Sequence, residues 1–543
     1  MNRSPETLHA PPRLLLWLVS VVFFLLIVAA LAGLSYFRAG QRIGAVIPFV
    51  AIAVAGVIIA AVGGALIFRK SLPRLMWLWV SLLAVIIVVA LVGGGIFAYR
   101  SILPPRYQEQ MLTEMPFMRA FLPPTPAGGA IPTVAAPTGG ISPDDLLSLL
   151  PAATEIAIPE VVTQQAISPT EEATVEQVVL APSTTPLPST TPTQPPTLAA
   201  TVAPTVELVP SLAQPTEAPE VAQQTSAVNR LPANRMYGFT YVRQGWNNCG
   251  PANITMALSH YGWRESQEFA ASILKPVTED KNVSPSEMVN FVRTQTQVSA
   301  ITRMGGDMGL LKDLISANVP VIVETGYSLE GEDWLGHYQT IVGYDDTQAV
   351  FYVYDSWLGT GTGDTGLPER YSDFDSRWQA FNRTFIVIYE KDREGVVQQI
   401  LGDRADVTEA DQHALEVATA EATADRQNGF AWFNIGTSYT RLGDYERAAA
   451  AYDQARLLDL PFRMLWYQFG PFEAYYETGR YGDMEALISS NLNTAGNYVE
   501  ETFYWQGKML AAQGQSSEAS AAFQRALAQN PNYEAAQTAL NAL

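Results

Sequence analysis

The chain has 543 residues, a formal net charge of −20 and a single cysteine, Cys249. Pro-rich, strongly apolar and Ala-rich blocks occupy different stretches, which favours several domains. The acidic excess argues against nucleic-acid binding, because phosphate contacts need Lys and Arg. One cysteine excludes an intramolecular disulfide and a multi-cysteine metal site. We predict no metal and no cofactor.

Three uncharged apolar stretches, 14–37, 43–68 and 75–99, each exceed the about 20 residues that a membrane-spanning helix needs. Residues 1–106 carry a charge of +8, so the remainder carries −28. Basic residues divide five to four between the two sides, which favours a cytoplasmic N-terminus. We therefore predict a multi-pass anchor in the cell membrane over residues 1–106, with the later domains outside the cytoplasm.

Much of the next stretch, 107–231, is rich in Pro, Thr, Ala and Ser, as in the run Pro182-Ser-Thr-Thr-Pro-Leu-Pro. A segment of this composition cannot bury enough apolar surface to offset the entropy lost on ordering. We predict an extended, disordered stalk here.

Residues 232–395 begin with helical patterns and continue with strand patterns, which predicts an α+β domain. One helix is expected from Cys249, and another after the capping box Ser284-Pro-Ser-Glu287. Apolar or alternating runs at 338–344 and 350–355 flank the turn Asp345-Asp346-Thr347-Gln348, which predicts a hairpin. A further helix is expected at 310–315, and further strands at 319–324 and 384–389.

Cys249 lies at the start of its predicted helix, where the helix dipole favours a thiolate. Gln244 precedes it by five residues, so its amide and the Cys249 backbone N–H are candidate donors to an oxyanion. A thiolate mechanism also needs a base, and His337 begins an apolar strand. The predicted hairpin brings residue 337 close to Asp355, which would orient the imidazole as the third member of a triad.

The other three histidines are placed less well. His9 precedes the first apolar stretch, and His413 lies beyond the α+β region. His260 lies eleven residues along the helix that Cys249 begins, about 16 Å from its start.

These motifs resemble family thirty-nine of the cysteine peptidases, the papain-like bacterial enzymes that process bacteriocins by cutting after double-glycine leaders. The resemblance rests on the Gln-x4-Cys-Gly-Pro, Gly-His-Tyr and Tyr-Asp-Ser-Trp segments and covers residues 232–392. It implies that Cys249 is the nucleophile, His337 the base, Asp355 the residue that orients it and Gln244 an oxyanion donor. Leader-processing members are typically fused to an export ATPase, whereas this sequence has no Gly-x4-Gly-Lys-Ser/Thr loop.

Residues 405–543 match the tetratricopeptide pattern, which predicts an all-α solenoid. The clearest copy comprises Trp432, Gly436, Tyr439, Gly443, Tyr445, Ala448, Tyr452, Ala455 and Pro461. Weaker copies are anchored at Gly479 and Gly514, at successive spacings of 36 and 35 residues. We expect this region to fold separately and to bind a protein partner.

The predicted fold class is thus multidomain: three transmembrane helices, an α+β papain-like cysteine peptidase domain and a tetratricopeptide solenoid. The predicted function is hydrolysis of peptide or protein substrates by a membrane-anchored thiol protease with a Cys-His-Asp triad. Two alternatives stay open. The same fold would serve as a non-catalytic, peptide-binding surface scaffold, or as an acyl or amide transferase, because transfer and hydrolysis share the acyl-thioester.

Overall fold

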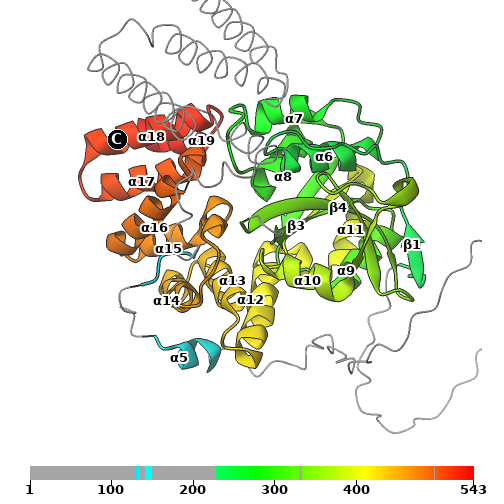
Figure 1. The fold of residues 1–543 in the computed structure, drawn as a ribbon, viewed down its shortest axis with the longest axis horizontal. Helices are drawn as coiled ribbons and strands as arrows, with labels where there is room; N and C mark the ends of the chain where they lie inside the picture. The colour runs from blue at the N-terminus through cyan, green and yellow to red at the C-terminus, as the bar shows by residue number, and fades with distance from the viewer. Residues whose placement is uncertain (1–129, 135–140, 149–227, 329–332, 495) are drawn as a thin grey trace, which may run out of the picture. The chain divides into compact units, whose positions relative to one another are not determined.

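The computed structural model describes residues 130–134, 141–148, 228–328, 333–494 and 496–543. All of them belong to one of the two structural units of the chain. They form an α+β domain followed by a stack of helices (Figure 1).

A seven-stranded antiparallel sheet forms the centre of the α+β domain. β3 is apolar at both odd and even positions, as Val321, Ile322 and Val323 show, because helices cover both faces of the sheet. In spatial order the strands are β2 (Ser299–Arg303), β7 (Phe385–Tyr389), β3 (Val321–Tyr327), β4 (Leu335–Asp345), β5 (Val350–Asp355) and β6 (Leu367–Arg370), while β1 (Ala233–Arg235) also pairs with β4.

Two sets of three helices enclose this sheet. The first set packs on the face that carries Ile322 and Ile386; it consists of α6 (Cys249–Ser259), α7 (Gln267–Leu274) and α8 (Pro285–Gln295). The second set packs on the face that carries Val321 and Phe385; it consists of α9 (Met308–Ser316), α10 (Tyr371–Gln379) and α11 (Glu394–Leu401). Each face therefore has its own apolar core.

Local sequence signals position several of these elements. The predicted capping box is confirmed at the start of α8, where the Ser284 side chain accepts from the Glu287 N–H and the Glu287 carboxylate accepts from the Ser284 N–H. The predicted hairpin is confirmed as β4 and β5. It contains an irregularity that the sequence did not indicate: a bulge between Ile341 and Gly343 shifts the register by one residue.

The helical region begins with α12 (Val407–Ala424) and continues with three helix pairs. Gly436 of α13 lies against the Tyr452 ring of α14, and Gly507 of α17 lies in the same way against Phe523 of α18. A side chain at either glycine would collide with the ring, so the small residue allows the paired helices to approach. The pairs are α13 (Gly429–Arg441) with α14 (Tyr445–Arg456), α15 (Gly470–Glu477) with α16 (Tyr481–Asn493), and α17 (Glu500–Ala512) with α18 (Ser516–Gln529), before the last helix α19 (Glu534–Asn541).

The repeats share a contact surface with the α+β domain. Trp334 stacks on Phe381 at 5.7 Å between ring centroids and also contacts Tyr467 of the repeats at 6.2 Å. Polar contacts extend along the helical stack: Arg383 with Glu421 (2.6 Å), Asn434 Nδ2 with Gln379 O (2.8 Å), Arg463 with Asp333 (2.8 Å), Lys281 N with Tyr498 O (3.1 Å) and Asn532 Nδ2 with Ile273 O (3.0 Å). The repeats thus form part of the packing of the α+β domain.

Two pieces of the predicted stalk also have defined positions. Residues 130–134 begin with an isolated β-bridge at Ala130, and Pro143–Ser148 form the short helix α5. Both pack on the repeats, through Ile131 and Leu146 respectively. The other stalk residues up to 227 lie outside the described ranges.

The predicted fold class needs one correction. It included three transmembrane helices, whereas no helix within the described ranges is long and apolar enough to cross a membrane. The longest, α12, has 18 residues and carries acidic side chains such as Glu409, Glu416 and Glu421 along its length. The structure therefore supports a fold class of an α+β domain with helical repeats. The stretches 14–37, 43–68 and 75–99 lie outside the described residues.

Candidate active site

Cys249 is the first residue of α6, as the sequence predicts, and is only partly exposed. His337 and the backbone N–H of Tyr338 act on its sulfur, and both lower the pKa of the thiol. Helix α6 therefore presents the thiol to the beginning of β4. A thiol with two such donors at a helix N-terminus is suited to carry negative charge.

His337 lies between the sulfur and a carboxylate. Its Nε2 atom is 3.0 Å from Oδ1 of Asp355, and both side chains are buried. The same Oδ1 accepts from the backbone N–H groups of Trp357 (2.7 Å) and Leu358 (2.8 Å). The turn after β5 thus fixes the carboxylate, which in turn fixes the imidazole.

The electrostatics of these three groups reinforce one another. Burial alone would raise the pKa of the Cys249 thiol, but the hydrogen bond and charge of His337 and the N–H of Tyr338 lower it. Burial would also lower the pKa of His337, but Asp355 and Cys249 raise it to about 10. Burial opposes ionisation of Asp355 as well, yet His337 and the turn N–H groups lower its pKa to about 2. The opposite shifts of Cys249 and His337 favour a thiolate–imidazolium pair at neutral pH.

Gln244 is held beside this group by Ser356. Its backbone N–H donates to the carbonyl of Ser356 (2.9 Å), and its Oε1 accepts from the Ser356 hydroxyl (2.7 Å). With the amide oxygen engaged in this way, the amide N–H groups are the donors that Gln244 offers to a ligand.

Asn253, one turn along α6, connects the segments that carry the site. Its Nδ2 donates to the carbonyls of Cys249 (3.0 Å) and Tyr338 (2.7 Å) and lies 3.2 Å from Ser356 Oγ. Its Oδ1 accepts from Thr340 (2.8 Å). This buried amide therefore joins α6 to β4 and to the turn after β5.

Lys275 holds the loop that precedes Cys249. Its buried ammonium lies within 3.4 Å of the carbonyls of Trp246, Asn247, Thr278 and Asp280. Asn247 has a left-handed φ of 51°, a conformation that asparagine adopts more readily than most residues other than glycine. The lysine contacts hold this loop, so the entry into α6 is fixed before substrate binds.

An apolar pocket opens beside His337 and Asp355. It is also lined by Tyr327, Leu335, Trp357 and Leu358. Trp357 is 44% exposed and Leu358 49% exposed. Large apolar side chains that are this exposed next to reactive groups are suited to contact an apolar part of a ligand.

The repeats reach the segments that carry the nucleophile and the base. Tyr467 packs on Gly336, where an added Cβ would lie 3.1 Å from its ring. On the Cys249 side, the Lys281 ammonium lies 5.2 Å from the Trp246 ring centroid and 6.0 Å from that of Trp466. Tyr467 and Trp466 belong to the segment between α14 and α15.

The remaining histidines lie elsewhere or are otherwise engaged. His260 stacks on Phe239, and its ring nitrogens contact Tyr237 O (2.8 Å) and Asn318 (3.2 Å). His413 lies 2.9 Å from Arg404. His9 is outside the described residues.

Comparisons with known proteins agree with this geometry. Residues 234–386 match the model of the Peptidase_C39 like family. Residues 429–460 and 501–533 match tetratricopeptide-repeat models. This chain contains a C39-like peptidase domain followed by tetratricopeptide repeats. The predicted resemblance is thereby confirmed.

Solved structures similar to this chain include two bacterial proteins. One is described as a C39-like peptidase from Bacillus anthracis, with 14% identity, 29% of this chain and 98% of that chain covered, and a TM-score of 0.25. The other is Xylellain, a cysteine protease from Xylella fastidiosa, with 14% identity, 33% and 94% coverage, and a TM-score of 0.24. No curated protein matches the chain.

Several residues around the C39-like site had no distinctive signal in the sequence. Ser356 follows Asp355 directly in the Tyr-Asp-Ser-Trp motif, and this position in the sequence was the only indication that it lies near the site. Its contact with Gln244 had no signal of its own. Asn253 is one helical turn after Cys249, a spacing that equally suits a core position. Lys275 and Tyr467 are distant in the sequence, and nothing in their local patterns indicated contact with this site.

Proposed function

We propose that the C39-like domain hydrolyses peptide bonds through an acyl-enzyme on Cys249. The proposal rests chiefly on one observation: the only cysteine of the chain begins α6 beside His337, whose imidazole is hydrogen-bonded to Asp355 at 3.0 Å. A nucleophile, a base and an orienting carboxylate in line form the arrangement that covalent hydrolases use.

In the proposed acylation step, the Cys249 thiolate attacks the substrate carbonyl carbon. The resulting oxyanion accepts hydrogen bonds from the Gln244 amide and the Cys249 backbone N–H. His337, protonated at the nitrogen that faces the sulfur, gives this proton to the departing amine as the C–N bond breaks. The products of this step are a free amine and an acyl-thioester.

In the proposed deacylation step, neutral His337 accepts a proton from a water molecule that attacks the thioester carbonyl. The C–S bond then breaks, the carboxylic acid leaves, and the thiolate–imidazolium pair is restored. Asp355 stays ionised throughout, consistent with its pKa of about 2. It holds the imidazole ring in one orientation for both proton transfers.

The exposed side chains of Trp357 and Leu358, which follow Asp355 directly, support contact with an apolar part of the substrate. The repeats support recruitment of a protein, because tetratricopeptide stacks bind protein partners. The scaffold alternative is less well supported, because a protein that only binds peptides does not need a nucleophile, a base and an orienting carboxylate in this arrangement. The transferase alternative shares every residue with hydrolysis.

The test is to incubate the full chain with a peptide library and to identify products by mass, with and without an added amine. The Cys249→Ala variant is the control for contaminating peptidases. Cleaved acids that form only with Cys249 present would support hydrolysis. Amide products that dominate at low amine concentration would favour transfer, and no product under either condition would favour the scaffold.

A further inference from the structure

Residues 130–134 form a short segment along the edge of the first repeat. Ala130 forms an antiparallel bridge with Pro461, and the Ile131 N–H donates to the carbonyl of Leu460 (2.7 Å). The carbonyl of Pro132 accepts from Nε of Arg456 (2.7 Å). Both main-chain and side-chain groups of the repeat thus bind the backbone of this segment.

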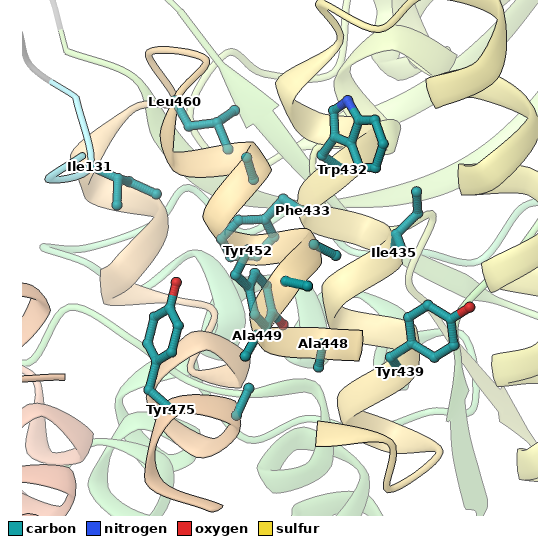
Figure 2. Close-up of a cluster of buried hydrophobic side chains, with 14 of the residues drawn as sticks. Ile131, Trp432, Phe433, Ile435, Tyr439, Ala448, Ala449, Tyr452, Leu460 and Tyr475 are labelled. Carbon is teal, nitrogen blue, oxygen red and sulfur yellow. The ribbon is translucent and has the colours of Figure 1, made fainter. Parts of the chain in front are cut away.

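Two apolar side chains of the same region are inserted into the repeat core. Ile131 is 2% exposed and Leu146 is 1% exposed. Ile131 and Leu146 belong to the same apolar cluster as Trp432 and Tyr452. Figure 2 shows Ile131 on the segment that enters beside Leu460, at the margin of this cluster. Residues from the predicted stalk therefore occupy apolar positions of the repeat domain.

Helix α5 supplies the second anchor. Ser142 caps it, accepting from the Asp145 N–H (3.1 Å) and donating to the Asp145 carboxylate (2.7 Å). The helix lies against α12 and α14 and buries Leu146, while Asp144 pairs with Arg426 at 2.7 Å. A helix of six residues is far too short to be stable alone, so contact with the repeats determines its conformation.

This arrangement has the features of peptide recognition. The backbone of Ala130 and Ile131 pairs with that of Leu460 and Pro461, the Ile131 side chain fills an apolar position, and a capped helical turn places one further apolar anchor. The first repeat is closed without it, because Gly436 and Tyr452 pack α13 against α14 directly. The segment is thus an addition to a complete helix pair.

We propose that residues 130–134 and 141–148, the linker segment, are an intramolecular ligand of a peptide-binding surface on the first repeat. Leu460, Pro461, Arg456 and Arg426 form the polar and backbone part of this surface. A partner that binds there must have the same chemistry: a branched apolar residue followed by proline, then a short helix with an acidic first turn. Such a partner binds only by displacing the linker segment.

Covalent attachment makes the internal ligand a strong competitor. A ligand on the same chain acts at an effective concentration on the order of millimolar, which lowers the apparent affinity of a competing peptide by roughly 10²-fold or more. We therefore expect that only partners with high intrinsic affinity displace the linker segment from this surface. This inference does not depend on peptidase activity.

The test uses the full chain and a fluorescent peptide with the sequence of residues 130–148. The variant Ile131→Asp/Leu146→Asp disables the internal copy and leaves the repeat surface unchanged. We expect anisotropy titrations to show peptide binding to this variant, and roughly 10²-fold weaker binding to the wild-type chain. A peptide carrying the same two substitutions should bind neither. The matched control chain Val396→Asp/Val407→Asp changes two exposed apolar residues elsewhere and should behave as the wild type.

Three results would overturn the proposal. The first is failure of the folded variant to bind the peptide. The second is loss of the helical circular-dichroism signal in the variant, which would make the segment an integral part of the repeat fold. The third is a wild-type dimer, by light scattering, that the variant converts to monomer, because the segment would then be exchanged between two copies.

Discussion

His337 and Asp355 meet because β4 contains one extra residue. Asp345 pairs with Val350 at the turn, and this register alone would place Asp355 opposite Thr340. The bulge between Ile341 and Gly343 instead pairs Asp355 with Gln339. Side chains alternate between the two faces of a strand, so residue 339 shares a face with residue 337 and residue 340 does not. The irregularity thus puts the carboxylate on the face of the imidazole.

The ionisation of the nucleophile gives the most direct prediction, because Cys249 is the only thiol. An unperturbed thiol titrates near about 8.5 and is mostly unreactive at pH 6. The pKa of Cys249 is lowered by His337 and the Tyr338 N–H despite burial. We expect iodoacetamide to alkylate Cys249 rapidly well below pH 7, as followed by intact mass.

Two variants test the cause of that reactivity. In His337→Ala the pH–rate curve should move toward that of a free thiol, and Asp355→Asn should lie between the two. His260→Ala is the matched control, since His260 contacts Tyr237 and Asn318 and no residue of the site. Slow alkylation at every pH, with no response to His337→Ala, would contradict the assignment of Cys249 as nucleophile.

Gln244 is expected to act on the transition state. Gln244→Ala should lower kcat by roughly 10²–10³-fold, the loss typical of one oxyanion donor, with little change in KM. Ser356→Ala should have a smaller effect, because the hydroxyl only holds the Gln244 amide. Gln295→Ala, at an exposed position on α8, is the control. Full activity of the Gln244→Ala variant would show that Gln244 has no role in catalysis.

The sequence predicted the parts of this structure that depend on local chemistry. The capping box Ser284–Glu287, the helix start at Cys249 and the two strands of the hairpin all have short-range signals. The bulge has none, because an extra residue in β4 changes neither the apolar pattern nor the turn. The contact between Gln244 and Ser356 depends on tertiary packing across 112 positions.

The fold of the repeats could be predicted from the sequence, but their contact with the α+β domain could not. The glycine and aromatic positions of the first repeat are determined by the packing of α13 on α14, which is a contact within that repeat. The docking of Tyr467 on Gly336 joins two domains, and neither residue has a pattern that identifies the other. Binding of the linker segment is of the same kind, since a Pro-rich composition indicates low intrinsic order and does not report a partner surface.

Removal of the repeats should therefore impair the peptidase domain. A chain that ends at residue 404 exposes Phe381, which is 2% exposed in the full chain, and removes the rings that pack around Trp334. Exposure of a buried aromatic side chain costs about 1.5–3 kcal/mol. We expect a lower midpoint of thermal unfolding and reduced turnover of small peptides. Equal stability and turnover in the two chains would show that the domains are independent.

Buried carboxyl groups where α17 meets the α+β domain predict how stability depends on pH. Asp280, Glu500 and Glu501 are all buried there, and Glu501 accepts from Asn282 (3.2 Å). Burial, followed by the charge of Glu287, raises the pKa of Glu500 to about 7. Burial and Glu500 also raise the pKa of Asp280 well above its usual value.

Because the folded pKa of Glu500 exceeds its unfolded value, the folded state binds more protons, and the free energy of unfolding must fall as pH rises from about 4.5 to about 7. A difference of this size corresponds to a loss on the order of 2–3 kcal/mol. Glu500→Gln mimics the protonated form and should be more stable than wild type at pH 8, with little difference at pH 5. The exposed Glu518→Gln is the control and should change neither value. Urea unfolding at pH 5 and pH 8 measures the free energy of unfolding of each chain. A Glu500→Gln variant that is less stable than the wild type at pH 8 would show that the charged carboxylate stabilises the contact.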